Sequence, residues 1–160
     1  MAWKGPEGLA DEVKTAIDAN WATKLAAINA EYADATVLAD FKNTYIGELE
    51  QNSIDGFPSL GILVEGQRGV EVHHLFVRMD ATLNLVCYVL DQNEERLERR
   101  AYRVARGVVE LLIEGMVDGV ITWQQIPDSL IFNYSPALTG DSAFLKAAMI
   151  QWDFRKKEDF

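Results

Sequence analysis

The chain has 160 residues, of which 49% are apolar and 25% charged, fractions typical of a folded domain rather than of an extensively disordered chain. Fifteen Lys and Arg residues against 25 Asp and Glu residues give a formal net charge of −10, which argues against a general binder of nucleic acid or anionic membranes. The length fits one domain, residues 1–160, and no apolar stretch approaches the roughly 20 residues that span a bilayer.

The N-terminal part predicts an amphipathic helix. After Gly5-Pro6, apolar residues recur at spacings of three or four with charged residues between them, and the many alanines would let another element approach closely. The recurring residues are Leu9, Val13, Ile17, Trp21, Leu25 and Ile28. The N-terminus lacks an apolar run of signal length, so we expect a protein made in the cytosol. Residues 30–56 are irregular and predict a connecting segment or insertion with a short helix.

Several strands are expected next. Pro58 biases the chain towards extended structure and predicts a strand at 59–65, joined by 66–69 to a second strand at 70–79. Residues 80–82 indicate a turn or bulge before the strand 83–90. Both faces of that last strand are largely apolar, which predicts a central strand covered on each side, or on one side by another subunit. Cys87, the single cysteine, is expected to be a small buried hydrophobic residue.

A long helix follows. Asp91 and Glu94 have the spacing of a capping box, and Gly115 is the expected stop of a helix that ends near Glu114. Its expected buried stripe comprises Leu97, Ala101, Val104, Val108 and Leu111.

The C-terminal part predicts strands. Residues 120–126 and 129–134 could pair as a hairpin, and 135–142 is a loop. Residues 143–154 fit either period, but the alternation in 150–154 favours a strand, followed by a solvated tail. The predicted fold class is therefore α+β, with a mixed, mostly antiparallel sheet packed against an N-terminal helix and one long central helix.

Five arginines of the long helix form what we call the arginine face: Arg96, Arg99, Arg100, Arg103 and Arg106. At about 100° per residue they span an arc of about 120°, at right angles to the apolar stripe. Like charges one turn apart destabilise a helix by a few tenths of a kcal/mol per pair. We therefore expect acidic groups opposite them, in the same chain or in a neighbouring copy, although a merely solvated face is the alternative. This face is the predicted subunit or partner interface.

No catalytic, metal or cofactor motif stands out. A strand would point His73 and His74 to opposite faces, so ordinary strand histidines are the expected interpretation, with a metal or acid–base site beside Glu71 or Asp80 as the alternative. No Gly-rich phosphate loop, nucleophile elbow or His-Glu-x-x-His occurs, and we predict that the chain is not an enzyme. The tryptophans are expected in the core, except for Trp3, which we expect to contact a partner.

The order of elements resembles that of the tail-terminator or neck proteins of long-tailed bacteriophages. The resemblance covers nearly the whole chain, and residues 31–55 depart from the compact form expected of that group. It rests on the Ala-rich first helix, the Pro58-led strand, the strand 83–90 running through Asp91 into the arginine-rich helix, the strand end 132–136, the Gly140-Asp141 loop and the last strand 144–150.

This resemblance implies a structural virion protein that forms a ring, commonly of six copies, at the neck. Such a ring caps the tail tube, joins it to the head connector or stopper protein, and lets DNA pass without specific binding, with no membrane and no cofactor. The protein would be made in the host cytoplasm, and a head-completion or tube protein of the same virion is an alternative. If the arginine face joins the copies, Arg99→Glu with Arg103→Glu is expected to abolish ring assembly in a folded monomer.

A function of another class is also open. The chain could be a small cytosolic enzyme or a ligand-binding α+β domain that uses the His73/His74 strand and a pocket beneath the long helix. A stable monomer with a tightly bound metal or small molecule would favour that alternative, and rings or binding to tube ends would favour the neck protein.

Overall fold

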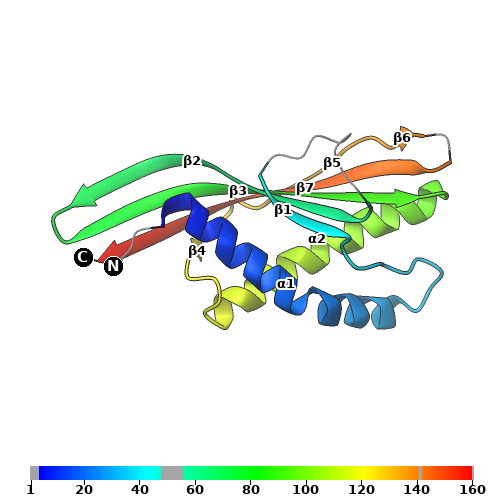
Figure 1. Cartoon of the computed structure of the whole chain (residues 1–160), viewed down its shortest axis with the longest axis horizontal. Helices are drawn as coiled ribbons and strands as arrows, with labels where there is room; N and C mark the ends of the chain where they lie inside the picture. Colours follow the sequence, from blue (N-terminus) through cyan, green and yellow to red (C-terminus); the bar gives the residue numbers. More distant parts are fainter. Residues whose placement is uncertain (1–3, 48–55, 141, 160) are drawn as a thin grey trace.

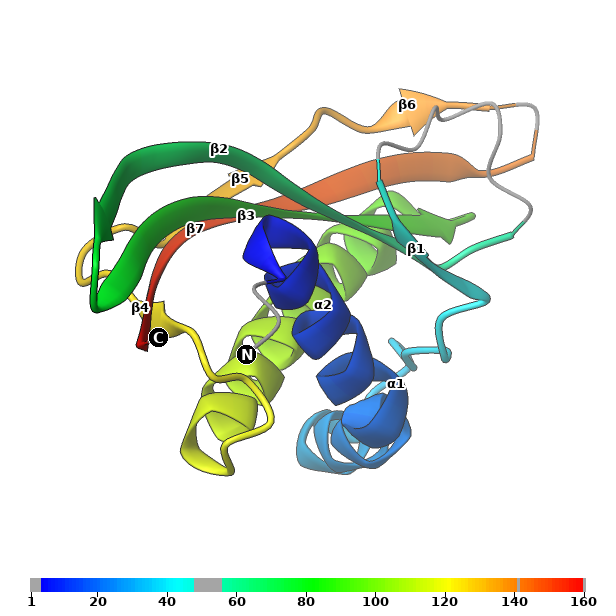
Figure 2. The ribbon, with the colours of Figure 1, turned by 60° about the vertical axis from the view of Figure 1, so that its left-hand side comes forward.

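Two helices cover one face of a seven-stranded sheet in the computed structural model, which describes residues 4–47, 56–140 and 142–159 (Figures 1 and 2). The element order is α1 (Gly5–Tyr32), β1 (Asn43–Ile46), β2 (Ser59–His73), β3 (Phe76–Asp91), α2 (Glu94–Val117), β4 (Gln124–Gln125), β5 (Ile131–Tyr134), β6 (Leu138–Thr139) and β7 (Phe144–Asp159). The predicted α+β class is confirmed.

Both helices extend beyond their predicted bounds. Helix α1 begins at Gly5-Pro6, where proline costs no helical hydrogen bond, and ends where Ala33 adopts the left-handed conformation with φ 41°. The N-cap of α2 is Asn93, whose side chain accepts a hydrogen bond from the Arg96 N–H. The predicted capping box began at Asp91, two residues too early. Gly115 was wrongly predicted as the stop. It lies inside α2, where an added Cβ would come within 3.1 Å of Ile121.

The sheet is mixed but mostly antiparallel. Strand β1 runs parallel to β2, whereas β2, β3 and β7 are long antiparallel neighbours. The short strands β4, β5 and β6 line up along the other edge of β7. Strand β1 pairs with residues 59–62 only, so beyond Ile62 the outer edge of β2 has no partner strand among the described residues.

Three local predictions differ from the structure, because long-range pairing overrides local signals. Residues 80–82 continue β3 and pair with β7, so the expected turn is absent there. The irregularity of the alternative, a bulge, falls in β2 instead, where the register shifts between Glu65 and Gln67 opposite Thr82 and Ala81. The expected hairpin does not form, since β4 and β5 each pair with β7. The tail predicted to be solvated is half-buried or exposed, but it is strand up to Asp159. The choice of strand for residues 143–154 is confirmed.

The core lies between the sheet and the helices. Alternate residues of β3 face the helices and are buried, and Trp21, Trp123 and Trp152 are buried with them. At the contact between α1 and α2, a Cβ on Gly107 would lie 2.6 Å from the Ile28 side chain, so glycine allows the close approach. Cys87 is fully buried as expected, and burial raises the pKa of its thiol to about 12.

The strands reach beyond the helices at one end of the molecule (Figure 1). There the β2–β3 hairpin and the end of β7 form a three-stranded extension, and Figure 2 shows the strands curving over the helix layer. Two register shifts in β2, between Glu65 and Gln67 and between Arg68 and Glu71, accompany this curvature, because bulges bend and twist a strand. The tip exposes Val72 and Leu75.

Candidate functional site

Both helices lie on the same side of the sheet, which leaves what we call the open face on the other side (Figure 2). In β3 the residues that point to this face alternate with the buried ones and are half-buried or exposed. They are Arg78, Asp80, Thr82, Asn84, Val86, Tyr88 and Leu90, together with their cross-strand partners in β2 and β7. The open face has a polar half near the extension and an apolar half near the start of α2.

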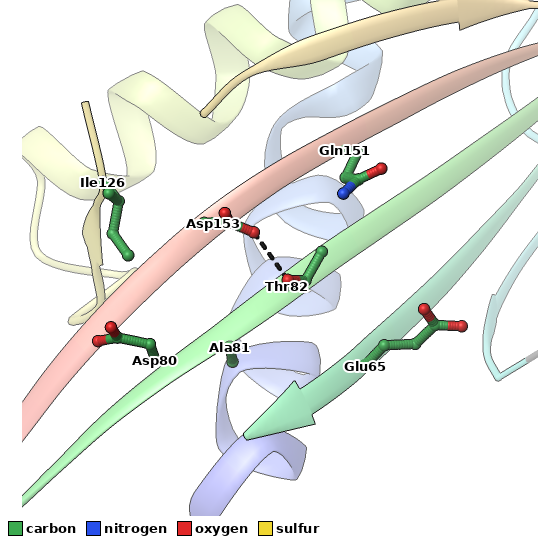
Figure 3. A pocket seen from close by; sticks show the side chains of 7 residues that line it. All are labelled: Glu65, Asp80, Ala81, Thr82, Ile126, Gln151 and Asp153. Atoms are coloured by element: carbon green, nitrogen blue, oxygen red, sulfur yellow. Dashed lines mark hydrogen bonds between the residues drawn. The ribbon is translucent and has the colours of Figure 1, made fainter. Parts of the chain in front are cut away.

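The polar half is a ladder of cross-strand pairs around a hollow of about 470 Å³ (Figure 3). Thr82 donates a hydrogen bond of 2.7 Å to Asp153, and Arg155 donates two, of 2.6 and 2.7 Å, to Asp80. The hydrogen bond from Arg155 holds the pKa of Asp80 below its ordinary value. Glu65 adds a third carboxylate to the wall, so the hollow is lined by three acids.

The apolar half has no such pairs. Val86 and Tyr88 of β3 and Leu63 of β2 are half-buried, and Leu90 and Met149 are exposed. An exposed apolar patch on a sheet is a surface that a partner commonly covers. The prediction that this strand is covered on one side by its own chain therefore fits the structure, and cover by a subunit on the other side stays a prediction.

Arg103 is the buried member of the arginine face. Its guanidinium donates hydrogen bonds of 2.9 and 2.6 Å to the two oxygens of Asp34 and one of 2.9 Å to the Thr36 carbonyl, and it lies 3.8 Å from the centre of the Tyr32 ring. These contacts fix the chain that follows α1 onto α2. The hydrogen bond from Arg103 lowers the pKa of Asp34 from 3.8 to about 2.

Arg106 and Arg99 also pair within the chain. Arg106 contacts Glu31 at 3.0 Å and Glu110 at 2.7 Å, and these hydrogen bonds raise its pKa. Arg99 lies 2.8 Å from Glu95 and 3.8 Å from Asp34. The sequence left open whether acids of the same chain or of a neighbouring copy oppose the arginine face. In the structure, acids of the same chain pair with these arginines.

Arg96 and Arg100 converge on Asp91. Arg96 donates hydrogen bonds of 3.2 and 3.1 Å to one carboxylate oxygen. The Nε of Arg100 lies 2.9 Å from the other oxygen and forms an ion pair with it, but their geometry does not make a hydrogen bond. Burial alone would raise the pKa of Asp91, but the Asn93 N–H and the two guanidiniums outweigh burial, and its pKa is lowered.

These contacts change which arginines a partner can reach. The Arg103 side chain is 6% exposed, whereas the other four are between 27% and 50% exposed. Replacing Arg103 by glutamate would set a carboxylate against Asp34, so the Arg99→Glu, Arg103→Glu monomer is expected to be less stable than the wild type, and the loss of ring assembly stays a prediction. An interface made by the other four arginines stays a prediction. Trp3, the remaining predicted contact residue, lies outside the described residues.

The two histidines are placed differently from the prediction. His73 ends β2 and His74 lies in the hairpin turn, so their rings lie side by side with centroids 4.1 Å apart, rather than on opposite faces. His73 also stacks on Phe76, and both histidines are exposed at the tip of the extension. Neither lines the hollow of the open face, and within residues 4–47, 56–140 and 142–159 no group of three or more His, Cys, Asp or Glu side chains is placed to hold a metal ion.

Sequence reasoning did not find the hollow of the open face. Its walls come from β2, β3 and β7, with Ile126 beside them, and the register of the strands brings together residues as far apart as Thr82 and Asp153. The period-two pattern of β3 was the one available signal, since it places Asp80, Thr82 and Asn84 on one face.

Neither a protein-family model nor a curated protein sequence matches the chain. Among the described residues, neither α1 nor α2 combines the length and apolarity that a membrane crossing requires.

Proposed function

We propose that the chain is a structural subunit that assembles into a ring at the end of a phage tail tube and leaves a passage for DNA. The observation that carries this proposal is the one-sided sheet, whose open face combines an apolar half with an acidic hollow. A subunit of an assembly needs such exposed apolar surface, because association is driven mainly by its burial.

The two halves of the open face suit two surroundings. The apolar half, with Val86, Tyr88 and Met149, would pack against the neighbouring copy or the tube. The acidic hollow, with Glu65, Asp80 and Asp153, would face the passage, where carboxylates repel DNA phosphates and keep the genome from adhering. The net charge of −10 supports this arrangement.

Ring formation also needs two different surfaces that meet between successive copies. The outer edge of β2 beyond Ile62, which has no partner strand among the described residues, and the far edge of the sheet at β5 are two such surfaces, since they lie at opposite sides of the same sheet. Open strand edges readily accept another strand, and this would continue the sheet from copy to copy.

Two measurements test the proposal. Light scattering of the purified protein is expected to give a mass several times that of the 18.0 kDa chain, and electron microscopy is expected to show it at the ends of tail tubes. A monomer that leaves tube ends bare at all concentrations would contradict the proposal. A ring whose passage is lined by arginine would contradict the part assigned to the acidic hollow.

A further inference from the structure

A second hollow lies at the start of α2, away from the open-face hollow, and we call it the arginine cavity. It has a volume of about 410 Å³ and is lined by Leu90, Asp91, Gln92, Arg96, Arg100 and Ser142, with two alanines. The two guanidiniums are the only cationic groups among these lining residues. The cavity therefore offers positive charge on a protein whose net charge is −10.

Asp91 holds both guanidiniums in place. Its side chain is 3% exposed, and one of its oxygens accepts two hydrogen bonds from Arg96 while the other pairs with Arg100 at 2.9 Å. One negative charge thus faces two positive charges, which leaves an excess of one positive charge in the cavity. Exposed arginines ordinarily lose side-chain entropy when they bind, but here much of that entropy is already lost.

Several donors of these guanidiniums remain for a ligand. Arg96 uses Nε and Nη2 on Asp91, and its Nη1 has no hydrogen-bond partner in the described part of the chain. Arg100 Nη1 is 3.5 Å from the Leu90 carbonyl, and its Nη2 has no such partner among the same residues. The α2 N-terminus does not itself form the site, because the Asn93 side chain caps the Arg96 N–H.

The two guanidiniums of this cavity suit an oxyanion. Guanidinium forks match carboxylates and phosphates in geometry and form charge-assisted hydrogen bonds with them. Glu94 is exposed in the first turn of α2, and the chain as a whole has a net charge of −10. A nucleic-acid backbone brings many phosphates close to this acidic protein and would be repelled, whereas a single carboxylate brings one negative charge beside the two guanidiniums.

We propose that the arginine cavity binds a single carboxylate. The carboxylate comes either from an acidic side chain of a second copy or from a small free molecule, and the two sources share the same recognition by Arg96 and Arg100. The inference does not depend on the ring, because the binding of a free carboxylate can be measured on the protein in any state of association.

Sodium acetate is the first probe, with sodium chloride at equal ionic strength as its reference. The chemical shifts of the arginine Nε–H groups are followed by NMR as acetate is added. The Arg96 and Arg100 signals are expected to shift along a saturating curve that chloride does not reproduce. If a second copy supplies the carboxylate, acetate will also lower the mass seen by light scattering; if the source is a free molecule, the mass will stay constant. Either outcome supports the site.

Variants of one helix make the test specific. Arg96→Gln is expected to weaken acetate binding by about tenfold or more, since a charge-assisted hydrogen bond is lost, while Arg100 still neutralises Asp91. Arg99→Gln is the matched control, because it removes the same charge from a neighbouring position that does not line the cavity. Arg100→Lys keeps the charge but loses the fork, and provides a second variant if Arg96→Gln unfolds.

Three results would overturn the carboxylate site. They are linear, non-saturating shifts with acetate, equal acetate binding by Arg96→Gln and Arg99→Gln, and displacement of acetate by a short DNA duplex, which would assign the cavity to phosphate. None of them bears on whether the chain forms rings, so failure here and failure of the proposed function are distinguishable.

Discussion

The two faces of β3 differ in what covers them, although both carry apolar residues near the end of the strand. The inward row, which includes Leu83, Leu85 and Cys87, is fully buried under the helices. The outward row, which includes Val86 and Tyr88, is half-buried, and neither α1 nor α2 lies over it. Apolar residues on both faces of a strand therefore do not show that its own chain covers both, and the uncovered face is where contacts with other molecules are expected.

The prediction with the largest expected effect compares the stability lost by a substitution on each face. Leu85→Ala removes a fully buried side chain and is expected to lower the free energy of unfolding by about 2–5 kcal/mol. Val86 is the next residue and points to the open face, so Val86→Ala is expected to lower the free energy of unfolding by about 1 kcal/mol or less. Urea unfolding of both variants measures the difference, and equal losses would mean that the open face is packed as tightly as the core.

The second prediction compares a buried and an exposed residue of the arginine face. Arg103→Gln leaves the buried Thr36 carbonyl without its donor and removes the pair with Asp34, for an expected loss of about 1–3 kcal/mol. Arg99→Gln, whose side chain is half exposed, is expected to change stability by about 0.5 kcal/mol or less. Chemical unfolding again provides the measurement, and an Arg103 variant as stable as the Arg99 variant would show that Arg103 does not hold residues 34–36 in place.

The third prediction concerns acid. The folded pKa of Asp34 is about 2 against an ordinary 3.8, so its contribution to stability is complete above about pH 4 and is lost as the pH falls towards 2. Asp34→Asn is expected to flatten the fall in stability across this window, as followed by unfolding at a series of pH values. A fall as steep as that of the wild type would mean that Asp34 does not titrate through this contact.

The smallest expected effect on stability lies in the acidic hollow. Glu65→Gln and Asp153→Asn change charge at the surface of the open face, where substitutions ordinarily stay within about 0.5 kcal/mol. Together they are expected to leave thermal unfolding nearly unchanged while increasing DNA retention at low salt, as measured by gel shift. Unchanged retention would count against a role for these carboxylates in repelling DNA.

Much of the framework could be predicted from the sequence. Helix α2 follows from a periodicity that extends over many residues, and the buried stripe of Leu97, Val104 and Leu111 lies where its spacing placed it. Such elements are specified locally, because a face of regular spacing fits one secondary structure.

The contacts of the site could not be predicted, because they join distant parts of the chain. Asp80 reads locally as a turn residue, but Arg155, 75 positions away, pairs with it in the sheet. Arg103 indicates a need for an acid without identifying Asp34, 69 positions away. For the histidines, one residue decided the outcome: the strand ends at His73, so the turn brings His74 to the same side.

The most direct test of the account is electron microscopy of tail tubes mixed with the wild-type chain and with Val86→Asp. The proposed function predicts that the wild type forms rings at tube ends and that Val86→Asp, which places a charge in the apolar half of the open face, stays folded but leaves the ends bare. Thermal unfolding of the variant checks its fold. Val86→Asp rings indistinguishable from those of the wild type would contradict the claim that the open face is a contact surface, and bare tube ends with both proteins would contradict the ring itself.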